Sequence, residues 1–374
     1  MAKRRANGEG YVAQRKDGRW ECKIVLPDGT RRSVYAKTQR EVLAKRDAEK
    51  DRAAAGLPPT SERQTVGEYL ATWLAGKKTQ VRASTWKRYA IDVRDATADL
   101  GRLKPAQLTP AHIQRLYARR LDAGVSKMTV RHLHAVLHDA FGDAVRWSLV
   151  ARNVVALVDP PKAERHEMRA FDEEQLRAFL AAAAGDALEA LYVLAVTTGM
   201  RQGELFGLRW QDVDLEKRML QVRQTISWAT GTALVSDPKT AKSRRRIELG
   251  QVAVDALRAH RTRQLEARLA RASAWDDRGL VFANEVGGAL HPSNVTNRRF
   301  RPLLERAHLP RIRFHDLRHT AATTLLGRSV PTKIVSEMLG HSSTSITADV
   351  YSHVTPTMQR AAASVMDAAV GGTR

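Results

Sequence analysis

Cysteine is nearly absent from this chain, and long apolar runs are missing altogether. The one cysteine, Cys22, excludes an internal disulfide framework and a cysteine-rich zinc site. No apolar run approaches the ~20 residues that a membrane-spanning helix needs. The basic N-terminus, residues 1–5, is not followed by the hydrophobic segment of a secretory signal. We therefore expect a soluble, cytoplasmic protein with no membrane partner.

Acidic residues are scarce relative to basic ones. The 374 residues include 62 Lys and Arg against 40 Asp and Glu, a formal net charge of +22 at pH 7. Basic residues outnumber acidic ones by 15 to 8 in residues 1–57, by 16 to 9 in 58–160 and by 31 to 23 in 161–374. This balance predicts a polyanionic partner, because contacts with phosphates release counterions and charge steers association. Three basic stretches predict three surfaces that face nucleic acid, whereas solubility alone needs no systematic positive excess.

The first 57 residues predict a small domain of three strands and one helix. Strands are expected over 11–15, 20–26 and 31–35, because Lys-Asp-Gly and Pro-Asp-Gly between them are hairpin signals. Thr38 and Glu41 have the spacing of a capping box, which predicts a helix to about Ala55. Residues 56–61 read as a linker by composition.

A helical domain is expected over residues 62–158. Apolar residues at helical spacing and capping signals predict helices that begin at 65, 82, 109 and 126. Its basic residues could follow a phosphate backbone, although each alone is an ordinary surface charge. The candidates for DNA contact are Lys77, Lys78, Arg82, Lys87 and Arg88.

A second linker, proline-broken and charged, is expected over 159–169, and a third domain over 165–374. The third domain reads as helical except between about 213 and 249, where short strands predict a small sheet. The fold class is therefore mainly α with small β-sheets, an α+β arrangement.

Four short motifs in the last domain carry the chemistry. They are Thr-Gly-Met-Arg-Gln-Gly-Glu-Leu at 198–205, His-Asp-Leu-Arg-His at 315–319, Leu-Gly-His at 339–341 and Val-Tyr-Ser-His at 350–353. Arginines grip the non-bridging oxygens of a phosphodiester, and a tyrosine hydroxyl can attack its phosphorus. This set of residue types therefore predicts a phosphodiester site with a covalent intermediate.

In order and wording these motifs resemble the tyrosine recombinases, the phage-integrase family, and the resemblance extends along essentially the whole chain. It implies that Arg201 and Arg318 bind the scissile phosphate and that Glu204 supports them. His315 would be the base for the tyrosine proton and His341 a hydrogen-bonding partner of the phosphate. The nucleophile would be Tyr351, ten residues after His341, where many members have nine.

The family also carries a lysine that protonates the leaving 5′ oxygen. Residues 238–246 read Pro-Lys-Thr-Ala-Lys-Ser-Arg-Arg-Arg and lie between two expected strands, as a hairpin tip would. The Pro-Lys-Thr wording favours Lys239, with Lys242 as the competitor and a purely phosphate-binding loop as the alternative. His315 and His319 have the spacing of a zinc pair but lack further ligands, so neither a metal nor another cofactor is predicted.

The resemblance implies a site-specific recombinase that forms a 3′-phosphotyrosine, the integrase of a phage or integrative element. The first domain resembles an arm-site DNA-binding domain and the second the SAM-like core-binding domain. Expected partners are attachment-site duplex DNA, further copies in a homotetramer, a directionality factor or excisionase, and a host DNA-bending protein. Residues 355–370 predict an amphipathic helix that docks within its own protomer or onto a neighbour. The expected location is the nucleoid of a bacterial host. The alternatives are a type IB topoisomerase and a non-catalytic basic DNA-binding protein.

Overall fold

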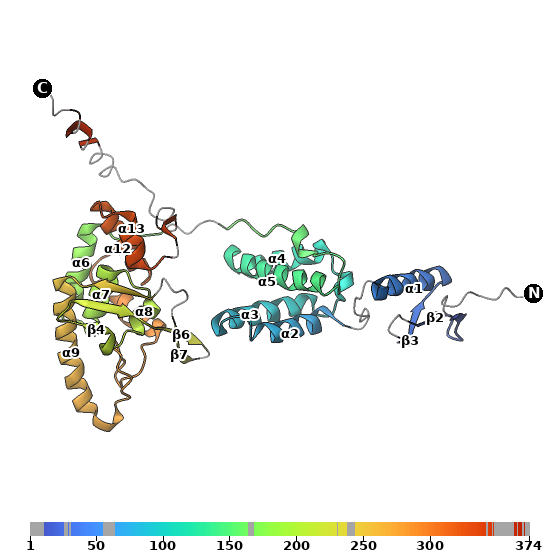
Figure 1. Cartoon of the computed structure of the whole chain (residues 1–374), viewed down its shortest axis with the longest axis horizontal. Coiled ribbons are helices and arrows are strands. Elements are labelled where there is room, and N and C mark those ends of the chain that lie inside the picture. Colours follow the sequence, from blue (N-terminus) through green and yellow to red (C-terminus); the bar gives the residue numbers. More distant parts are fainter. Residues whose placement is uncertain are drawn as a thin grey trace, which may run out of the picture. The chain divides into compact units, whose positions relative to one another are not determined.

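The computed structural model of the chain is shown in Figure 1, and its contacts divide the chain into two compact units, Met1–Arg165 and His166–Arg374. Each unit is described by itself. The structure describes residues 11–25, 29, 31–54, 64–163, 168–229, 231–237, 244–341, 343–345, 347, 363–364, 366–368 and 370.

The chain begins with an antiparallel three-stranded sheet in the order β1-β2-β3, followed by one helix. Thr38 and Glu41 form the predicted capping box, since each backbone N–H donates to the other side chain at 3.3 Å. Alternate residues of the strands face α1 and bury a small core with Val42. The elements are β1 (Tyr11–Gln14), β2 (Trp20–Val25), β3 (Arg31–Ala36) and α1 (Gln39–Ala54).

The other face of this sheet is open. Register places Tyr11 beside Lys23 and Val25 beside Arg31 across neighbouring strands. Tyr11 is 63% and Val25 62% exposed, so large side chains and cations share an uncovered surface.

A four-helix segment with its own core follows. The helices begin at the predicted caps: Thr65 and Glu68 form a capping box, and Ser126 accepts a hydrogen bond from the Thr129 backbone at 3.2 Å. At its centre the buried Trp73 donates from its indole nitrogen to Asp143 at 2.7 Å. The elements are α2 (Val66–Lys77), α3 (Ala83–Leu100), η1 (Pro105–Gln107), α4 (Pro110–Asp122), α5 (Lys127–Arg146) and η2 (Val155–Leu157).

The second unit is built around α7 (Glu189–Thr198), which is buried along nearly its whole length and packs against α9 and α12. Asp172 and Gln175 form a capping box at the start of α6. A helix that is apolar on every side must be central, because it has no face for water. The other helical elements are α6 (Glu173–Ala183), α8 (Gln202–Phe206), η3 (Trp210–Asp212), α9 (Gln251–Arg271), η5 (Ala272–Ala274), α10 (Pro292–Val295), the π-helical turn η6 (Thr296–Phe300), α11 (Arg301–Arg306), α12 (Asp316–Gly327) and α13 (Thr332–Leu339).

Two small sheets lie in this unit where the sequence predicted one. The three-stranded sheet has the order β4-β5-β8, and β6 and β7 form a separate hairpin that the sequence reading missed. The two strands between which residues 238–246 were expected to lie, β5 and β8, pair antiparallel, and β6 and β7 pair with each other. Residues 238–243 lie outside the described residues, so the expected hairpin tip stays a prediction. The strands are β4 (Val213–Asp214), β5 (Met219–Val222), β6 (Thr225–Ala229), β7 (Thr232–Ser236) and β8 (Arg245–Glu248).

Within the part of the chain that the structure describes, none of the helices has the length and apolar character to span a membrane.

Candidate active site

The site begins at the sharp turn between α7 and α8. Gly199 ends α7 with φ +61°, in the left-handed region that favours glycine. A Cβ on Gly199 would lie 2.4 Å from Cδ2 of the buried Leu339, so space as well as conformation requires glycine. Two residues later Arg201 is extended and caps the start of α8. The sequence Thr-Gly-Met-Arg therefore forms a turn that places Arg201 at the start of α8.

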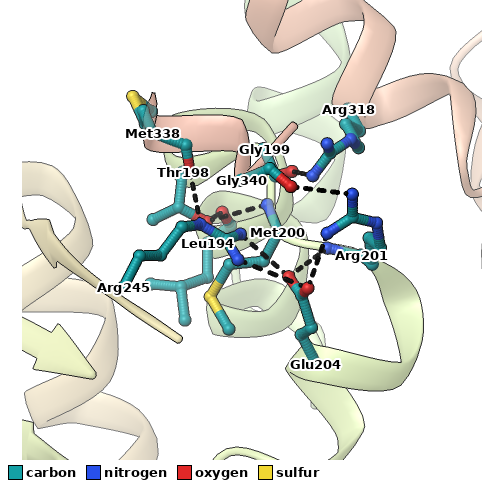
Figure 2. Close-up of polar contacts among 10 residues, drawn as sticks. All are labelled: Leu194, Thr198, Gly199, Met200, Arg201, Glu204, Arg245, Arg318, Met338 and Gly340. Carbon is teal, nitrogen blue, oxygen red and sulfur yellow. Dashed lines mark hydrogen bonds and ion pairs between the residues drawn. The ribbon is translucent and has the colours of Figure 1, made fainter. Parts of the chain in front are cut away.

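Arg201 is held by the buried Glu204 one turn along α8. Nη1 of Arg201 donates to Oε1 of Glu204 at 2.9 Å, and the Arg201 backbone N–H donates to Oε2 at 3.0 Å. Figure 2 shows these bonds together with a third, from Nη2 of Arg201 to the Gly340 carbonyl at 3.1 Å. The Arg201 side chain is still 37% exposed, so the held guanidinium can meet an incoming anion.

Arg318 lies on α12 and is buried. Its Nη1 donates to the Gly199 carbonyl at 2.7 Å. Figure 2 shows the guanidinium groups of Arg201 and Arg318 directed toward the neighbouring carbonyls of Gly340 and Gly199. Both predicted phosphate-binding arginines are thus oriented by the same junction of α7, α8 and α13.

His341 directly follows the end of α13, where Gly340 has φ +68°. Its Nδ1 lies 2.7 Å from Oγ1 of the buried Thr347. Burial lowers the pKa of His341 to about 4, and the positive charges of Arg318, Arg201 and Arg245 act in the same direction. The imidazole is therefore neutral at pH 7 while no anion is bound.

His315 precedes α12 and lies one turn before Arg318, and its ring centroid is 5.5 Å from that of His319. The pKa of His315 is lowered to about 4, first by burial and then by the neighbouring His319 and Arg318. His315 also reaches the surface, and with its pKa lowered in this way it is a neutral base at pH 7. No group of three or more potential metal ligands occurs among the described residues.

The sequence reading missed one charged residue of this site, Arg245. It is the first residue of β8, and its side chain is 7% exposed. Its Nη2 donates to Oε2 of Glu204 at 2.8 Å and its Nε to the Met338 carbonyl at 2.6 Å. Burial favours a protonated Glu204, but the hydrogen bond and charge of Arg245, with those of Arg201, keep its pKa below the ordinary value. The sequence did not single out Arg245, because it is the middle of three consecutive arginines that were interpreted as part of a basic loop.

The structure thus brings Arg201, Glu204, Arg318 and His341 together from three separate stretches of sequence. The remaining predicted residues, Lys239, Lys242 and Tyr351, lie outside the described residues, so their roles stay predictions.

Two of the basic residues predicted to contact DNA in the helical segment have acidic partners. Nζ of Lys77 lies 3.0 Å from Asp139 and 3.1 Å from Asp143, and its side chain is 14% exposed. Arg88 donates to Asp92 at 3.0 Å. These contacts already compensate both charges, so a phosphate would have to compete for them.

The other three candidates are Lys78, Arg82 and Lys87. Lys78 is exposed, with its ammonium 5.8 Å from the ring centroid of Trp86, and Arg82 is exposed at the start of α3. Lys87 is half-buried. These side chains fit the predicted DNA contact better than Lys77 and Arg88 do.

Two oriented arginines, a carboxylate that fixes one of them and neutral histidines are the kinds of group that can bind the oxygens of a phosphodiester. Comparison with known proteins agrees with this chemistry. The model of the phage integrase family matches residues 168–358, and that of the phage integrase N-terminal SAM-like domain matches 65–121.

Individual relatives extend the match to nearly the whole chain. The tyrosine recombinase XerC-like protein of Caldanaerobacter subterraneus subsp. tengcongensis is 33% identical over 87% of this chain and 88% of its own length. An integrase of Streptomyces ambofaciens is 31% identical over 98% of each chain. The chain therefore belongs to the phage integrase family, and it is a tyrosine-type, site-specific recombinase that acts on DNA.

Solved structures share the fold at lower identity. The Tn1549 transposon integrase in complex with a circular intermediate DNA has a TM-score of 0.69 and 21% identity, covering 81% of this chain and 99% of that one. A lambda integrase dimer bound to a core site has a TM-score of 0.58 and 17% identity, covering 93% and 96%.

Proposed function

We propose that this recombinase is the integrase of a phage or another integrative element and that it cuts DNA through a 3′-phosphotyrosine on Tyr351. The observation that carries the proposal is the convergence of Arg201, Arg318 and His341 on one junction of the fold. Tyr351 follows that junction in the chain and falls inside the segment matched by the family model. The two alternative functions are those of a type IB topoisomerase and of a non-catalytic DNA-binding protein.

In the first step the guanidinium groups of Arg201 and Arg318 bind the non-bridging oxygens of the scissile phosphate. The Tyr351 hydroxyl forms a bond to phosphorus while the bond to the 5′ oxygen breaks. The two permanent positive charges stabilise the negative charge that accumulates on the phosphorane. The product is a 3′-phosphotyrosine and a free 5′ hydroxyl, and the bond energy is conserved for the second step.

Two proton transfers accompany this step. Free tyrosine titrates near ~10, so its proton needs an acceptor, and the neutral His315 serves as that base. The departing 5′ oxygen takes a proton from Lys239, with Lys242 as the alternative donor. When the 5′ hydroxyl of a partner duplex attacks the phosphotyrosine, the same transfers run backwards.

His341 binds the phosphate rather than the tyrosine. Nδ1 of His341 lies beside Thr347 at 2.7 Å, so Nε2 is the ring nitrogen that we propose to bind the phosphate. A neutral imidazole with Nε2 protonated donates to an oxygen without adding a charge, and the bound anion raises the pKa of the ring.

The proposal assigns DNA handling to three domains, 1–57 for arm-type sites, 62–158 for core-type sites and 165–374 for catalysis. Support for the first is the open sheet face, where Tyr11, Val25 and Arg31 are exposed. A small sheet with cations and large side chains suits a DNA groove. In the second, Lys78, Arg82 and Lys87 are proposed to contact phosphates.

Strand exchange requires further partners. We propose a homotetramer that binds two attachment-site duplexes, coupled by the C-terminal helix predicted over 355–370. A directionality factor or excisionase and a host DNA-bending protein would set the outcome, and the reaction would take place at the nucleoid in the cytoplasm of a bacterial host.

The test uses a nicked suicide duplex carrying the core of the element's own attachment site. Loss of the short nicked fragment traps the covalent intermediate, so wild type should give an SDS-resistant adduct and Tyr351→Phe should give none. Phenylalanine keeps the ring and removes the nucleophile, which makes it the matched control. Equal absence of adduct in both proteins on the correct site would refute the enzyme mechanism and favour a binding protein. An adduct that only relaxes supercoils, without joining two duplexes, would favour the topoisomerase.

A further inference from the structure

Arg245 is buried between the carboxylate of Glu204 and the end of α13. Its side chain, 7% exposed, leaves β8 and makes two hydrogen bonds to Glu204, from Nη2 to Oε2 at 2.8 Å and from Nη1 to Oε1 at 3.3 Å. A third bond, from Nε to the Met338 carbonyl, is 2.6 Å long. Figure 2 shows the Glu204 carboxylate and the Met338 carbonyl around this guanidinium. Burying a charged side chain this deeply is costly unless its partners are well placed.

Glu204 consequently serves two arginines at once. Oε1 accepts from Nη1 of Arg201 at 2.9 Å and from Arg245, while Oε2 accepts from the Arg201 backbone N–H at 3.0 Å and from Arg245. Four donors on two oxygens leave the carboxylate a single orientation. The orientation of Arg201 therefore depends on Arg245 through Glu204.

Arg245 also affects Arg201 through its positive charge. A pair made of Arg201 and Glu204 alone would be neutral, and an incoming phosphate would meet the carboxylate charge as well as the guanidinium. With Arg245 the buried group carries one net positive charge. The negative charge of Glu204 is compensated from behind, so Arg201 retains its attraction for the anion.

Arg245 also fixes the segment that carries His341. It binds the Met338 carbonyl, and Arg201 binds the Gly340 carbonyl at 3.1 Å. Cations at these carbonyls match the partial negative charge of a helix C-terminus. A Cβ on Gly340 would lie 2.9 Å from Nη1 of Arg245, so the Leu-Gly-His turn and Arg245 are packed against each other.

We propose that Arg245 is a positioning residue of the strand-transfer reaction: it compensates Glu204 and ties it to the end of α13, so that Arg201 and His341 meet the scissile phosphate together. The inference deepens the proposed function and rests on it. In this proposal Arg245 acts through its contacts with Glu204 and with the backbone that precedes His341.

The test compares Arg245→Met and Arg245→Lys with Arg177→Met, a control arginine on α6 whose side chain is 72% exposed and pairs with Glu173. Single-turnover cleavage of the suicide duplex is measured at saturating DNA. We expect Arg245→Met to lower the cleavage rate about 100-fold, the effect of a catalytic group displaced by about 1 Å. Arg245→Lys keeps the charge without the three-bond geometry and should fall between Arg245→Met and wild type. Arg177→Met should cleave as wild type, and the duplex Kd should change less than about 3-fold in all three.

A second substrate separates positioning from mere folding. In a methylphosphonate duplex one charged non-bridging oxygen is replaced by a methyl group, so less negative charge depends on Arg201. We expect the deficit of Arg245→Met relative to wild type to shrink at least about tenfold on this substrate. Equal deficits on both substrates, or a deficit that follows only the thermal midpoint of the protein, would overturn the inference.

Arg245→Lys keeps the test decisive if Arg245→Met does not fold. A lysine variant that folds and cleaves both substrates at the wild-type rate also overturns the inference. Absence of adduct from wild type would instead refute the proposed function itself, so the two failures are distinguishable.

Discussion

Gly199 offers a quantitative check on the geometry that orients both arginines. Its φ of +61° costs a residue with a Cβ about 1–2 kcal/mol. A Cβ there would also lie 2.4 Å from Cδ2 of Leu339, which is fully buried and cannot move into solvent. Overpacking of this kind typically costs about 1–3 kcal/mol more. We therefore expect Gly199→Ala to destabilise the junction of α7 and α13 by about 2–5 kcal/mol.

The matched control is Gly279→Ala. Gly279 has nearly the same φ, +64°, but nothing lies within 4 Å of its added Cβ, so this variant reports only the backbone cost of about 1–2 kcal/mol. Amide hydrogen exchange of the full chain, followed in peptides from α7 and α13 for Gly199→Ala and around residue 279 for the control, gives the local opening free energies. Equal losses in the two variants would mean that Leu339 does not confine Gly199, and the packing argument would fail.

Two further predictions concern titration and the helical segment. The pKa values of His315 and His341 are lowered to about 4 in the folded chain, so the unfolded chain takes up their protons first as the pH drops. The urea midpoint of wild type should therefore fall between about pH 6.5 and pH 4. A His315→Asn, His341→Asn double variant should show a smaller fall, and equal falls in the two proteins would contradict the prediction. The variant Trp73→Phe removes the 2.7 Å hydrogen bond from the indole to the buried Asp143. The free energy that protects α2 and α5 from hydrogen exchange should fall by about 1–3 kcal/mol. If both helices keep wild-type protection, the hydrogen bond from the indole does not stabilise them.

Local rules were enough to predict much of the fold. Capping boxes at Thr38 and Thr65 start helices where the sequence placed them, because a cap is specified by residues only three apart. The β6–β7 hairpin was missed, although its strands contain Ile226, Trp228 and Val235, residue types that favour strands.

The site divides in the same way. Arg201, Arg318 and His341 lie in short motifs that can be recognised in the sequence without knowledge of the fold. The structure brings them together at one junction. Arg245 has no such motif, because Arg244 and Arg246 flank it and the three are chemically identical in the sequence. Strand pairing alone distinguishes them: within β8, alternation turns Arg245 inward and Arg246 outward.

This hidden arginine explains why a carboxylate can occupy a site built for an anion. Glu204 is 3% exposed and lies directly beside Arg201, where its charge alone would oppose a phosphate. Placed between two guanidinium groups, it becomes a bridge instead: each oxygen bonds both Arg201 and Arg245. The carboxylate supplies direction and Arg245 supplies the compensating charge. In the proposed mechanism Arg201 must stay both fixed in position and attractive to an anion, and Arg245 on β8 supplies the charge that compensates Glu204.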